Sequence, residues 1–225
     1  MVWYVLMQTV SQYPGQCEKL YDPVLVIGTG RSGTSIVAGM LYRMGVYMGE
    51  YFRPPDEHNP FGYYEDRDFN SLFNKAATDN DELDFRLNLE RLIITRRAMY
   101  RPWGIKDPKI TDCLEIFLLY FSNAKFIVCK RNKTDCVKSI LNQTRSLGRS
   151  KEWAEGCYDQ RKEIIEHLLN DQKVLEIEFD QLLEDPETIA KQILLFVYHE
   201  RIIAAKNSLK SRTEIEKIKR EYAHK

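Results

Sequence analysis

The sequence has few of the features that mark disulfide-rich, metal-binding or nucleic-acid-binding proteins. Its five cysteines are an odd number without a Cys-x-x-Cys pair, which indicates reduced thiols rather than a disulfide framework. Its four histidines show no paired ligand spacing, so we expect no metal site. The 33 basic residues equal the 33 acidic ones, and this balance gives no overall attraction for nucleic acid.

The sequence also lacks an apolar run of the roughly 20 residues that a membrane-spanning helix needs. Residues 1–7 are apolar, but Gln8 and Thr9 end the run, and no basic segment of a signal peptide accompanies it. We therefore expect residues 1–22 to form an N-terminal arm. We also expect a cytoplasmic protein without a membrane span.

What the sequence does contain fits an α/β fold. Short apolar runs predict strands at residues 24–27, 103–106, 125–129 and 174–179. Apolar residues at helical spacing predict helices at 35–44, 81–98, 112–121, 135–144, 151–170 and from Pro186 onward. This alternation predicts a central parallel sheet flanked by helices. Such a sheet binds its ligands beyond the carboxyl ends of the strands.

The sequence predicts a single domain, and two further segments are assigned from their composition. The length of 225 residues and the hydrophobic share of 44% predict one globular domain over residues 1–225. Residues 50–65 are rich in proline, asparagine, glycine and aromatic residues, and they predict a loop. Residues 213–225 are charged and predict a surface helix.

A glycine-rich turn follows the first predicted strand and precedes a predicted helix. It reads Gly-Thr-Gly-Arg-Ser-Gly-Thr-Ser over residues 28–35. Glycines let such a turn point backbone N–H groups at a bound anion, and the helix N-terminus adds its positive end. The candidate phosphate-binding residues are Thr29, Gly30, Arg31, Ser32, Gly33, Thr34 and Ser35.

The same turn argues against ATP chemistry. Four residues separate Gly28 from Gly33, as in the P-loop of proteins that bind nucleoside triphosphates. In those proteins a lysine follows the second glycine and reaches the β- and γ-phosphates, whereas here Thr34 stands in its place. Arg31 supplies a cation inside the turn instead.

A second candidate anion site follows the strand predicted at residues 125–129. Arg131 lies at the strand end, and Ser139 lies eight residues later on the predicted helix. A guanidinium and a hydroxyl in these positions could both donate hydrogen bonds to one phosphate. Taken alone, the pattern fits a solvated basic strand end equally well.

Together, the turn at residues 28–35, Arg131 and Ser139 resemble the signature of sulfotransferases that use 3′-phosphoadenosine 5′-phosphosulfate (PAPS). The resemblance covers about residues 24–197 and implies a P-loop NTPase-like sulfotransferase fold. In that family the turn holds the 5′-phosphosulfate, the Arg…Ser pair holds the 3′-phosphate, and no metal is required.

Further segments extend the resemblance. They are residues 59–66, Lys106-Asp107-Pro108 and residues 179–186. The C-terminal Arg-Lys-Gly phosphate loop of the family has no clear counterpart, and the weak substitutes are Lys206, Lys210 and Arg212.

The resemblance also implies which side chains react. Lys106 occupies a position similar to the family lysine beside the transferred group, where it would stabilise developing negative charge. Several sulfotransferase branches use a glutamate soon after the first helix as the base for the acceptor proton, and Glu65 fits that position. The competing candidates for the base are Glu50, Glu57, His58 and Asp107.

The predicted function is in-line transfer of the sulfuryl group of PAPS to a hydroxyl of a small molecule or glycan, with PAP as the other product. Trp103 either stacks near the adenine or fills the sheet face. A group of aromatic residues either lines the acceptor pocket or packs in the core. Its members are Tyr47, Tyr51, Phe52, Phe61, Tyr63 and Tyr64.

Two other functions stay open on the sequence alone. One is a nucleotide-dependent small-molecule kinase with a degenerate P-loop, which would need Mg²⁺ and an acidic residue at a strand end. Asp180, after the last predicted strand, is the only candidate for that acid. The other is a non-catalytic nucleotide-binding module that regulates a partner.

Overall fold

The computed structural model describes residues 22–60, 62–79, 82–99, 102–121, 123–170 and 172–199. The chain forms two compact units, the first ending at Asp180 and the second beginning at Gln181. A single domain over residues 1–225 stays a prediction. The predicted arm, apart from Asp22, and the predicted helix at 213–225 lie outside the described residues.

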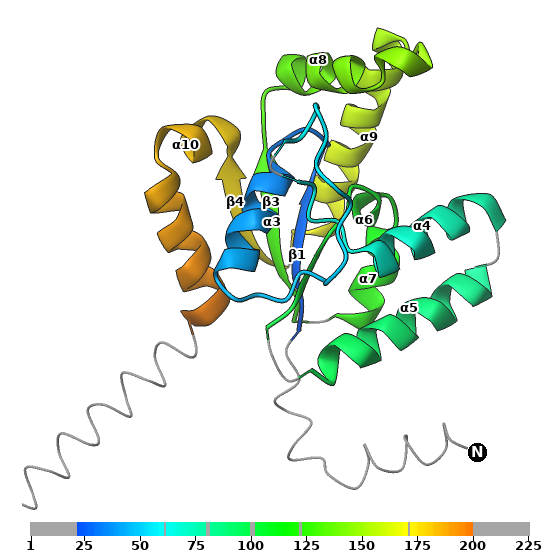
Figure 1. Cartoon of the computed structure of the whole chain (residues 1–225), viewed down its shortest axis with the longest axis vertical. Helices are drawn as coiled ribbons and strands as arrows, with labels where there is room; N and C mark the ends of the chain where they lie inside the picture. Colours follow the sequence, from blue (N-terminus) through cyan, green and yellow to red (C-terminus); the bar gives the residue numbers. More distant parts are fainter. Residues whose placement is uncertain are drawn as a thin grey trace, which may run out of the picture. The chain divides into compact units, whose positions relative to one another are not determined.

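The first unit is built on a four-stranded parallel sheet (Figure 1). The strands are β1 (Val24–Gly28), β2 (Gly104–Lys106), β3 (Lys125–Lys130) and β4 (Lys173–Glu178). Their order is β2-β1-β3-β4, and each neighbouring pair is parallel. The structure thus confirms the four predicted strands and the central parallel sheet.

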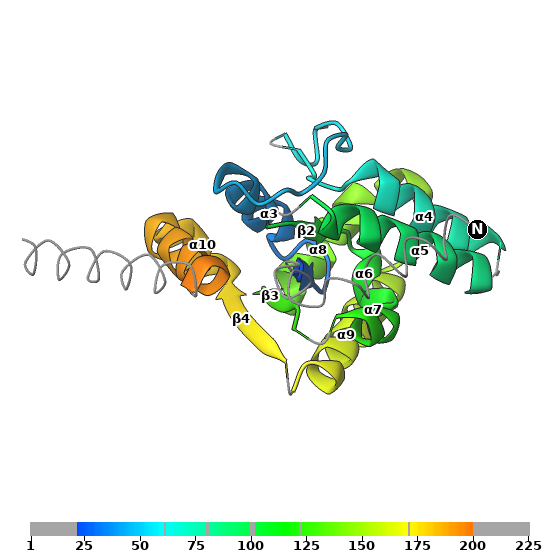
Figure 2. The ribbon, with the colours of Figure 1, turned by 90° about the horizontal axis from the view of Figure 1, so that it is seen from below.

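Helices cover both faces of this sheet. They include α3 (Thr34–Arg43) and α9 (Lys151–Leu168), and α8 (Lys133–Gln143) packs against α9. These elements confirm three predicted helices. Figure 2 shows α3 on one face of the sheet and α9 on the other. Every residue of β1 is buried, as expected of a central parallel strand that is covered on both sides.

The structure contains a helix that the sequence did not predict. This helix, α4 (Arg67–Asp79), precedes α5 (Glu82–Arg97), which confirms the helix predicted at 81–98. The segment of α4 is rich in Asp, Asn and Thr, which are weak helix formers. Its helix is stabilised by tertiary packing, because Phe69, Leu72 and Phe73 are all buried in the core.

The predicted helix at 112–121 is two short helices, α6 (Lys109–Asp112) and α7 (Leu114–Tyr120). The first helix begins before the predicted residue 112. Its first turn is stabilised by Asp107, whose carboxylate accepts a hydrogen bond from the backbone N–H of Lys109 at 2.9 Å. The two helices separate at Cys113, whose φ of −126° is not helical.

The main core lies between β1, β3 and the helices α4, α5 and α7. Trp103 is buried in it, with its ring 5.8 Å from that of Phe121 in an edge-to-face arrangement. Trp103 does not line the pocket described below. Its position therefore supports the packing interpretation.

The second unit continues from α10 (Phe179–Glu184), which spans the boundary, into a helix over residues 186–199. This helix begins at the predicted Pro186, and its buried apolar side chains are Ile189, Ile193 and Val197. Among the described residues of the chain, no helix is both long and apolar enough to cross a membrane.

Two helical glycines give a matched pair for stability measurements. Gly156 lies inside α9 with open space around its Cα, so Gly156→Ala is expected to raise the free energy of unfolding by about 0.5–1 kcal/mol. A Cβ on Gly39 of α3 would lie 2.9 Å from the ring of Tyr64. Gly39→Ala is therefore expected to lower the free energy of unfolding, by about 1–3 kcal/mol. Urea denaturation of both variants tests this, and equal stabilisation would contradict the close packing of Tyr64 on α3.

Candidate active site

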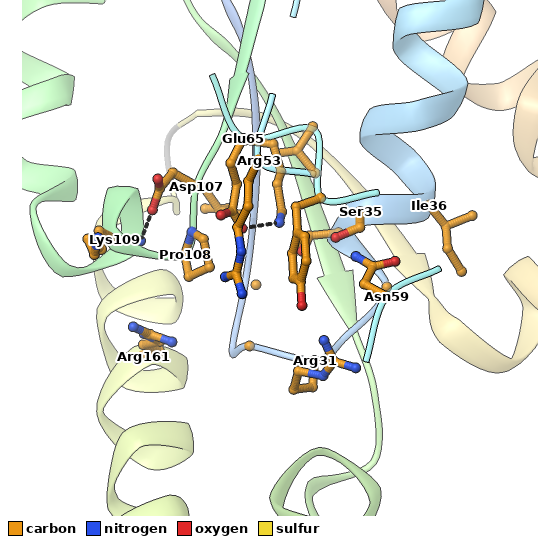
Figure 3. A pocket seen from close by; sticks show the side chains of 18 of the residues that line it. Arg31, Ser35, Ile36, Arg53, Asn59, Glu65, Asp107, Pro108, Lys109 and Arg161 are labelled. Atoms are coloured by element: carbon orange, nitrogen blue, oxygen red, sulfur yellow. Dashed lines mark hydrogen bonds and ion pairs between the residues drawn. The ribbon is translucent and has the colours of Figure 1, made fainter. Parts of the chain in front are cut away.

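A pocket of about 400 Å³ opens at the carboxyl ends of β1, β2 and β3. Its walls come from the glycine-rich turn after β1, the segment 106–109 after β2 and Arg131 after β3. The loop before α4 contributes Arg53, Asn59, Tyr63 and Glu65 (Figure 3). The pocket therefore lies where parallel α/β sheets bind their ligands.

The turn over residues 28–35 has the backbone geometry of an anion-binding loop. Gly30 and Gly33 have φ values of 92° and 94°, and Arg31 has a φ of 56°. Such left-handed residues, followed by a helix, turn successive N–H groups to one side. The first N–H groups of α3 have no partner within the helix, so they are free to bind an anion.

The side chains of this turn divide into two groups. Arg31, Thr34 and Ser35 line the pocket, as do Gly30 and Gly33. Thr29 and Ser32 do not: the Thr29 hydroxyl lies 3.9 Å from the Cys136 sulfur, and Ser32 is fully buried. Thr29 and Ser32 can therefore offer an anion only their backbone N–H groups.

Ser32 lies against Gly28 inside the turn. A Cβ on Gly28 would lie 2.3 Å from the Ser32 hydroxyl oxygen, so only glycine leaves room for this side chain. None of the described residues forms a hydrogen bond with that hydroxyl. Gly28 therefore leaves space for the Ser32 side chain inside the turn.

The structure brings the two predicted anion sites together. Arg31 donates through Nε to the hydroxyl of Ser139 at 3.0 Å and through Nη2 to the carbonyl oxygen of His58 at 2.9 Å. Arg131 donates to the carbonyl oxygen of Arg31 at 3.0 Å, and its guanidinium lies 4.1 Å from the centre of the Phe179 ring. Arg31 thus links the turn to α8, a contact that the sequence did not predict.

The predicted catalytic pair is in direct contact. Lys106 Nζ lies 2.7 Å from Glu65 Oε1, and the two side chains are only 3% and 6% exposed. Burial lowers the pKa of Lys106, while the Glu65 carboxylate opposes this shift. Figure 3 shows Glu65 beside Arg53 and between Asp107 and Ser35.

A buried arginine holds the segment that carries Glu65. Arg96 of α5 donates to Asp66 at 2.6 Å, to Asp68 at 2.8 Å and to the Tyr47 hydroxyl at 3.2 Å. The Arg96 and Asp66 side chains are 7% and 5% exposed. Because Asp66 follows Glu65 directly, this ion pair fixes the backbone that presents Glu65 to Lys106.

Asp107 lines the pocket, but its carboxylate is already engaged. One oxygen accepts a hydrogen bond from the side chain of Asn70 at 2.9 Å, and the other accepts from the backbone of Lys109. The other rivals of Glu65 lie elsewhere, because none of them is among the lining residues. They are Glu50, Glu57 and His58.

Among the five described members of the aromatic group, three pack against other side chains and do not line the pocket, namely Tyr47, Phe52 and Tyr64. Tyr63 does line it, donates to Asp56 at 2.8 Å and lies under the Arg53 guanidinium at 3.9 Å. Phe52 and Tyr64 have their ring centres 5.5 Å apart, and Tyr51 is largely exposed. Phe61 lies outside the described residues, as do the C-terminal basic residues 206, 210 and 212.

Several polar lining residues were not predicted as site residues. They are Arg53, Asn59, Asn70, Lys109, Gln143 and Arg161. Their spacing in the sequence gives no signal, because the fold brings them together from five different segments. Within the described residues, no group of three or more His, Cys, Asp or Glu side chains is arranged to hold a metal ion.

The parallel sheet, its flanking helices and the glycine-rich turn after the first strand define an α/β protein with a P-loop-like fold. A family model described as "Sulfotransferase family" matches residues 23–200. The chain therefore belongs to the sulfotransferase family. Membership supports sulfotransferase activity in general, and it implies a sulfonate donor and a small-molecule acceptor.

Solved structures share this fold. The sulfotransferase domain of the Synechococcus PCC 7002 olefin synthase is 18% identical, with a TM-score of 0.54, over 79% of this chain and 73% of that one. Sulfotransferase STF9 from Mycobacterium avium is 14% identical, also with a TM-score of 0.54, over 84% of this chain and 67% of that one. No curated protein matches the sequence.

Proposed function

We propose that this chain transfers the sulfuryl group of PAPS to a hydroxyl of a small molecule or glycan. The observation that carries the proposal is the cluster formed by the glycine-rich turn, Arg31 and Arg131 at one pocket, with Ser139 hydrogen-bonded to Arg31 just outside the lining residues. Two guanidinium groups beside a turn of free N–H groups suit a ligand with phosphates at two positions. PAPS is such a ligand, with a 5′-phosphosulfate and a 3′-phosphate.

In the proposed binding mode, the turn holds the 5′-phosphosulfate. The backbone N–H groups from Thr29 to Ser35 and the hydroxyls of Thr34 and Ser35 would bind its oxygens. Arg131 and Ser139 would bind the 3′-phosphate. Arg31 bridges the two groups of residues and so fixes the distance between the two anion sites.

The proposed reaction is a single displacement. The acceptor oxygen forms a bond to sulfur while the bond from sulfur to the bridging phosphate oxygen breaks, and PAP leaves. The acceptor proton passes to the Glu65 carboxylate, and the Lys106 ammonium stabilises the charge that develops on the leaving oxygen. Asp107 is the alternative base.

The contact between Lys106 and Glu65 bears on this mechanism. The Glu65 carboxylate opposes the fall that burial causes in the pKa of Lys106, and so it favours the ammonium form of Lys106 that the mechanism uses. Asp107 has less capacity to act as the base, because both of its oxygens already accept hydrogen bonds. This difference favours Glu65 over Asp107 as the base for the acceptor proton.

The kinase alternative has less support. A kinase with this fold uses a lysine after the second glycine of the turn, and this chain has Thr34 there. Asp180, the only acid proposed to hold Mg²⁺, is not among the residues that line the pocket. A non-catalytic nucleotide-binding module would bind PAP tightly without turnover on any acceptor.

Arg131→Ala tests the proposed 3′-phosphate site. Loss of charge-assisted hydrogen bonds worth about 1.5–3 kcal/mol is expected to weaken PAP binding by about 10–100-fold. Binding of adenosine 5′-phosphate, which lacks the 3′-phosphate, is expected to change by less than about threefold. Isothermal titration calorimetry measures both affinities.

Lys130→Ala is the matched control for this experiment. Lys130 is the neighbouring cation at the same strand end, but it pairs with Glu176 at 2.6 Å and does not line the pocket. PAP affinity should stay within about threefold of wild type in this variant. An equal loss of affinity for both nucleotides in Arg131→Ala would reject the 3′-phosphate assignment.

Glu65→Gln tests the proposed base. The variant keeps the size of the side chain and removes its proton acceptor, so kcat is expected to fall by about 10²–10⁴-fold while PAPS affinity changes little. Glu57→Gln, in the same loop and 87% exposed, should retain wild-type kcat. If Asp107→Asn shows the large loss and Glu65→Gln does not, Asp107 is the base instead.

A further inference from the structure

Arg161 of α9 is a pocket residue that the proposed mechanism does not use. Its Nε and Nη2 atoms donate to the two carboxylate oxygens of Asp112, at 2.8 and 2.9 Å. These two nitrogens form one edge of the planar guanidinium. The bidentate pair therefore fixes the direction of the group and leaves Nη1 on the other edge.

The free edge of Arg161 faces the glycine-rich turn. A Cβ on Gly30 would lie 3.2 Å from Arg161 Nη1, so the guanidinium lies directly against the backbone of the turn. Among the described residues, none accepts a hydrogen bond from Nη1. Gly30 thus provides both the left-handed backbone, with its φ of 92°, and the space for this side chain.

The position of Arg161 differs from that of the nucleotide-binding arginines. Figure 3 shows Arg161 reaching the pocket from α9, on the same side as Asp107 and Lys109, whereas Arg31 lies on the opposite side of the turn. Arg31 in turn contacts Ser139 and Arg131, the residues assigned to the 3′-phosphate. Arg161 therefore lies on the side of the turn away from the residues assigned to the 3′-phosphate.

A purely structural role explains less of this geometry. The Asp112 side chain is 45% exposed, and partly exposed ion pairs contribute little to stability, typically up to about 1 kcal/mol. Such a pair does not require Nη1 to lie against a pocket. A guanidinium whose free N–H groups point at an anion-binding turn is suited to an oxyanion.

We propose that Arg161 contacts the sulfuryl group of PAPS through Nη1 and lets the site distinguish the donor from the product PAP. This inference rests on the proposed function, because it assumes that PAPS occupies the pocket. The sulfuryl group is the part of the donor that PAP lacks. A residue that touches only this group affects PAPS binding and turnover but not PAP binding.

The test compares the affinities of wild type and Arg161→Ala for PAPS and for PAP, each without an acceptor, by isothermal titration calorimetry. Arg161→Ala is expected to weaken PAPS binding by about 10–100-fold, the effect of one lost charge-assisted contact. PAP binding is expected to stay within about threefold. Arg161→Gln repeats the measurement with a longer side chain, in case the alanine variant folds poorly.

Two controls separate the cation from its packing. Lys162→Ala removes the next cation of α9, which is exposed and pairs with Glu166, and should change neither affinity. Asp112→Asn breaks the ion pair with Arg161 but keeps the cation. It is expected to lower the melting temperature about as much as Arg161→Ala, with a smaller change in PAPS affinity.

The outcomes are distinguishable. Equal weakening of PAPS and PAP in Arg161→Ala, or no change in either affinity, would overturn the assignment of Arg161 and leave the proposed function intact. A wild-type protein that binds neither nucleotide would overturn the proposed function itself, together with this inference.

Discussion

Replacing Lys106 with alanine is expected to lower kcat by about 10²–10³-fold while PAP affinity stays within about threefold. In the proposed mechanism, the Lys106 ammonium stabilises charge that appears only as the bond from sulfur to phosphate breaks. A buried donor that acts on such charge is typically worth this much in kcat. Steady-state kinetics with PAPS and an acceptor, together with PAP titration, measure the two quantities.

This variant needs a control for folding, because Glu65 is buried and would lose its cation. Leaving one partner of a buried ion pair alone typically costs about 3–5 kcal/mol. The double variant Lys106→Ala/Glu65→Gln removes both charges and is expected to regain much of that stability without regaining activity. Lys133→Ala removes a lysine that pairs with Asp159 and does not line the pocket, and it should retain most of the activity. A kcat for Lys106→Ala within about threefold of wild type would contradict the proposed role.

Replacing Arg96 with leucine is expected to lower the free energy of unfolding by about 3–5 kcal/mol. Arg96 is the buried cation that holds Asp66, and its loss leaves that carboxylate buried without its cation. Burial already raises the pKa of Asp66, and the positive charge of Arg96 opposes this rise. Urea denaturation measures the loss of stability.

Arg86→Leu is the matched control, on the same helix. Its guanidinium is exposed and pairs with Glu82 one turn away, so the variant should lose no more than about 0.5 kcal/mol. Arg96→Leu/Asp66→Asn removes both buried charges and is expected to recover part of the stability. If Arg96→Leu were no less stable than Arg86→Leu, the buried ion pair would not stabilise the segment that carries Glu65.

The strands and the glycine-rich turn could be predicted from local pattern. An apolar run such as Val24–Gly28 is unambiguous in a parallel sheet, because both faces of the strand are buried. The turn at 28–35 is equally local, since its glycines and the following helix are contiguous in the sequence. These features needed no knowledge of distant contacts.

The remaining features depend on contacts between distant segments. Helix α4 forms because three apolar side chains pack into the core, and its composition does not favour a helix. Arg96 lies 30 residues from Asp66, and Arg31 lies 108 residues from Ser139. Nothing in the local sequence at either end of these pairs specifies its partner. The predicted Glu65 and Lys106 were named separately, and only the fold shows that they touch.

The most direct test of the central claim is a thermal-shift titration of the wild-type protein with PAP, ADP and ATP–Mg²⁺ in parallel. A ligand at about 100 times its Kd stabilises the native state by roughly 2.7 kcal/mol. The account predicts a large rise in melting temperature with PAP and small rises with ADP and ATP–Mg²⁺. A rise that appears only with ATP–Mg²⁺ would contradict PAPS as the donor and would favour the kinase alternative.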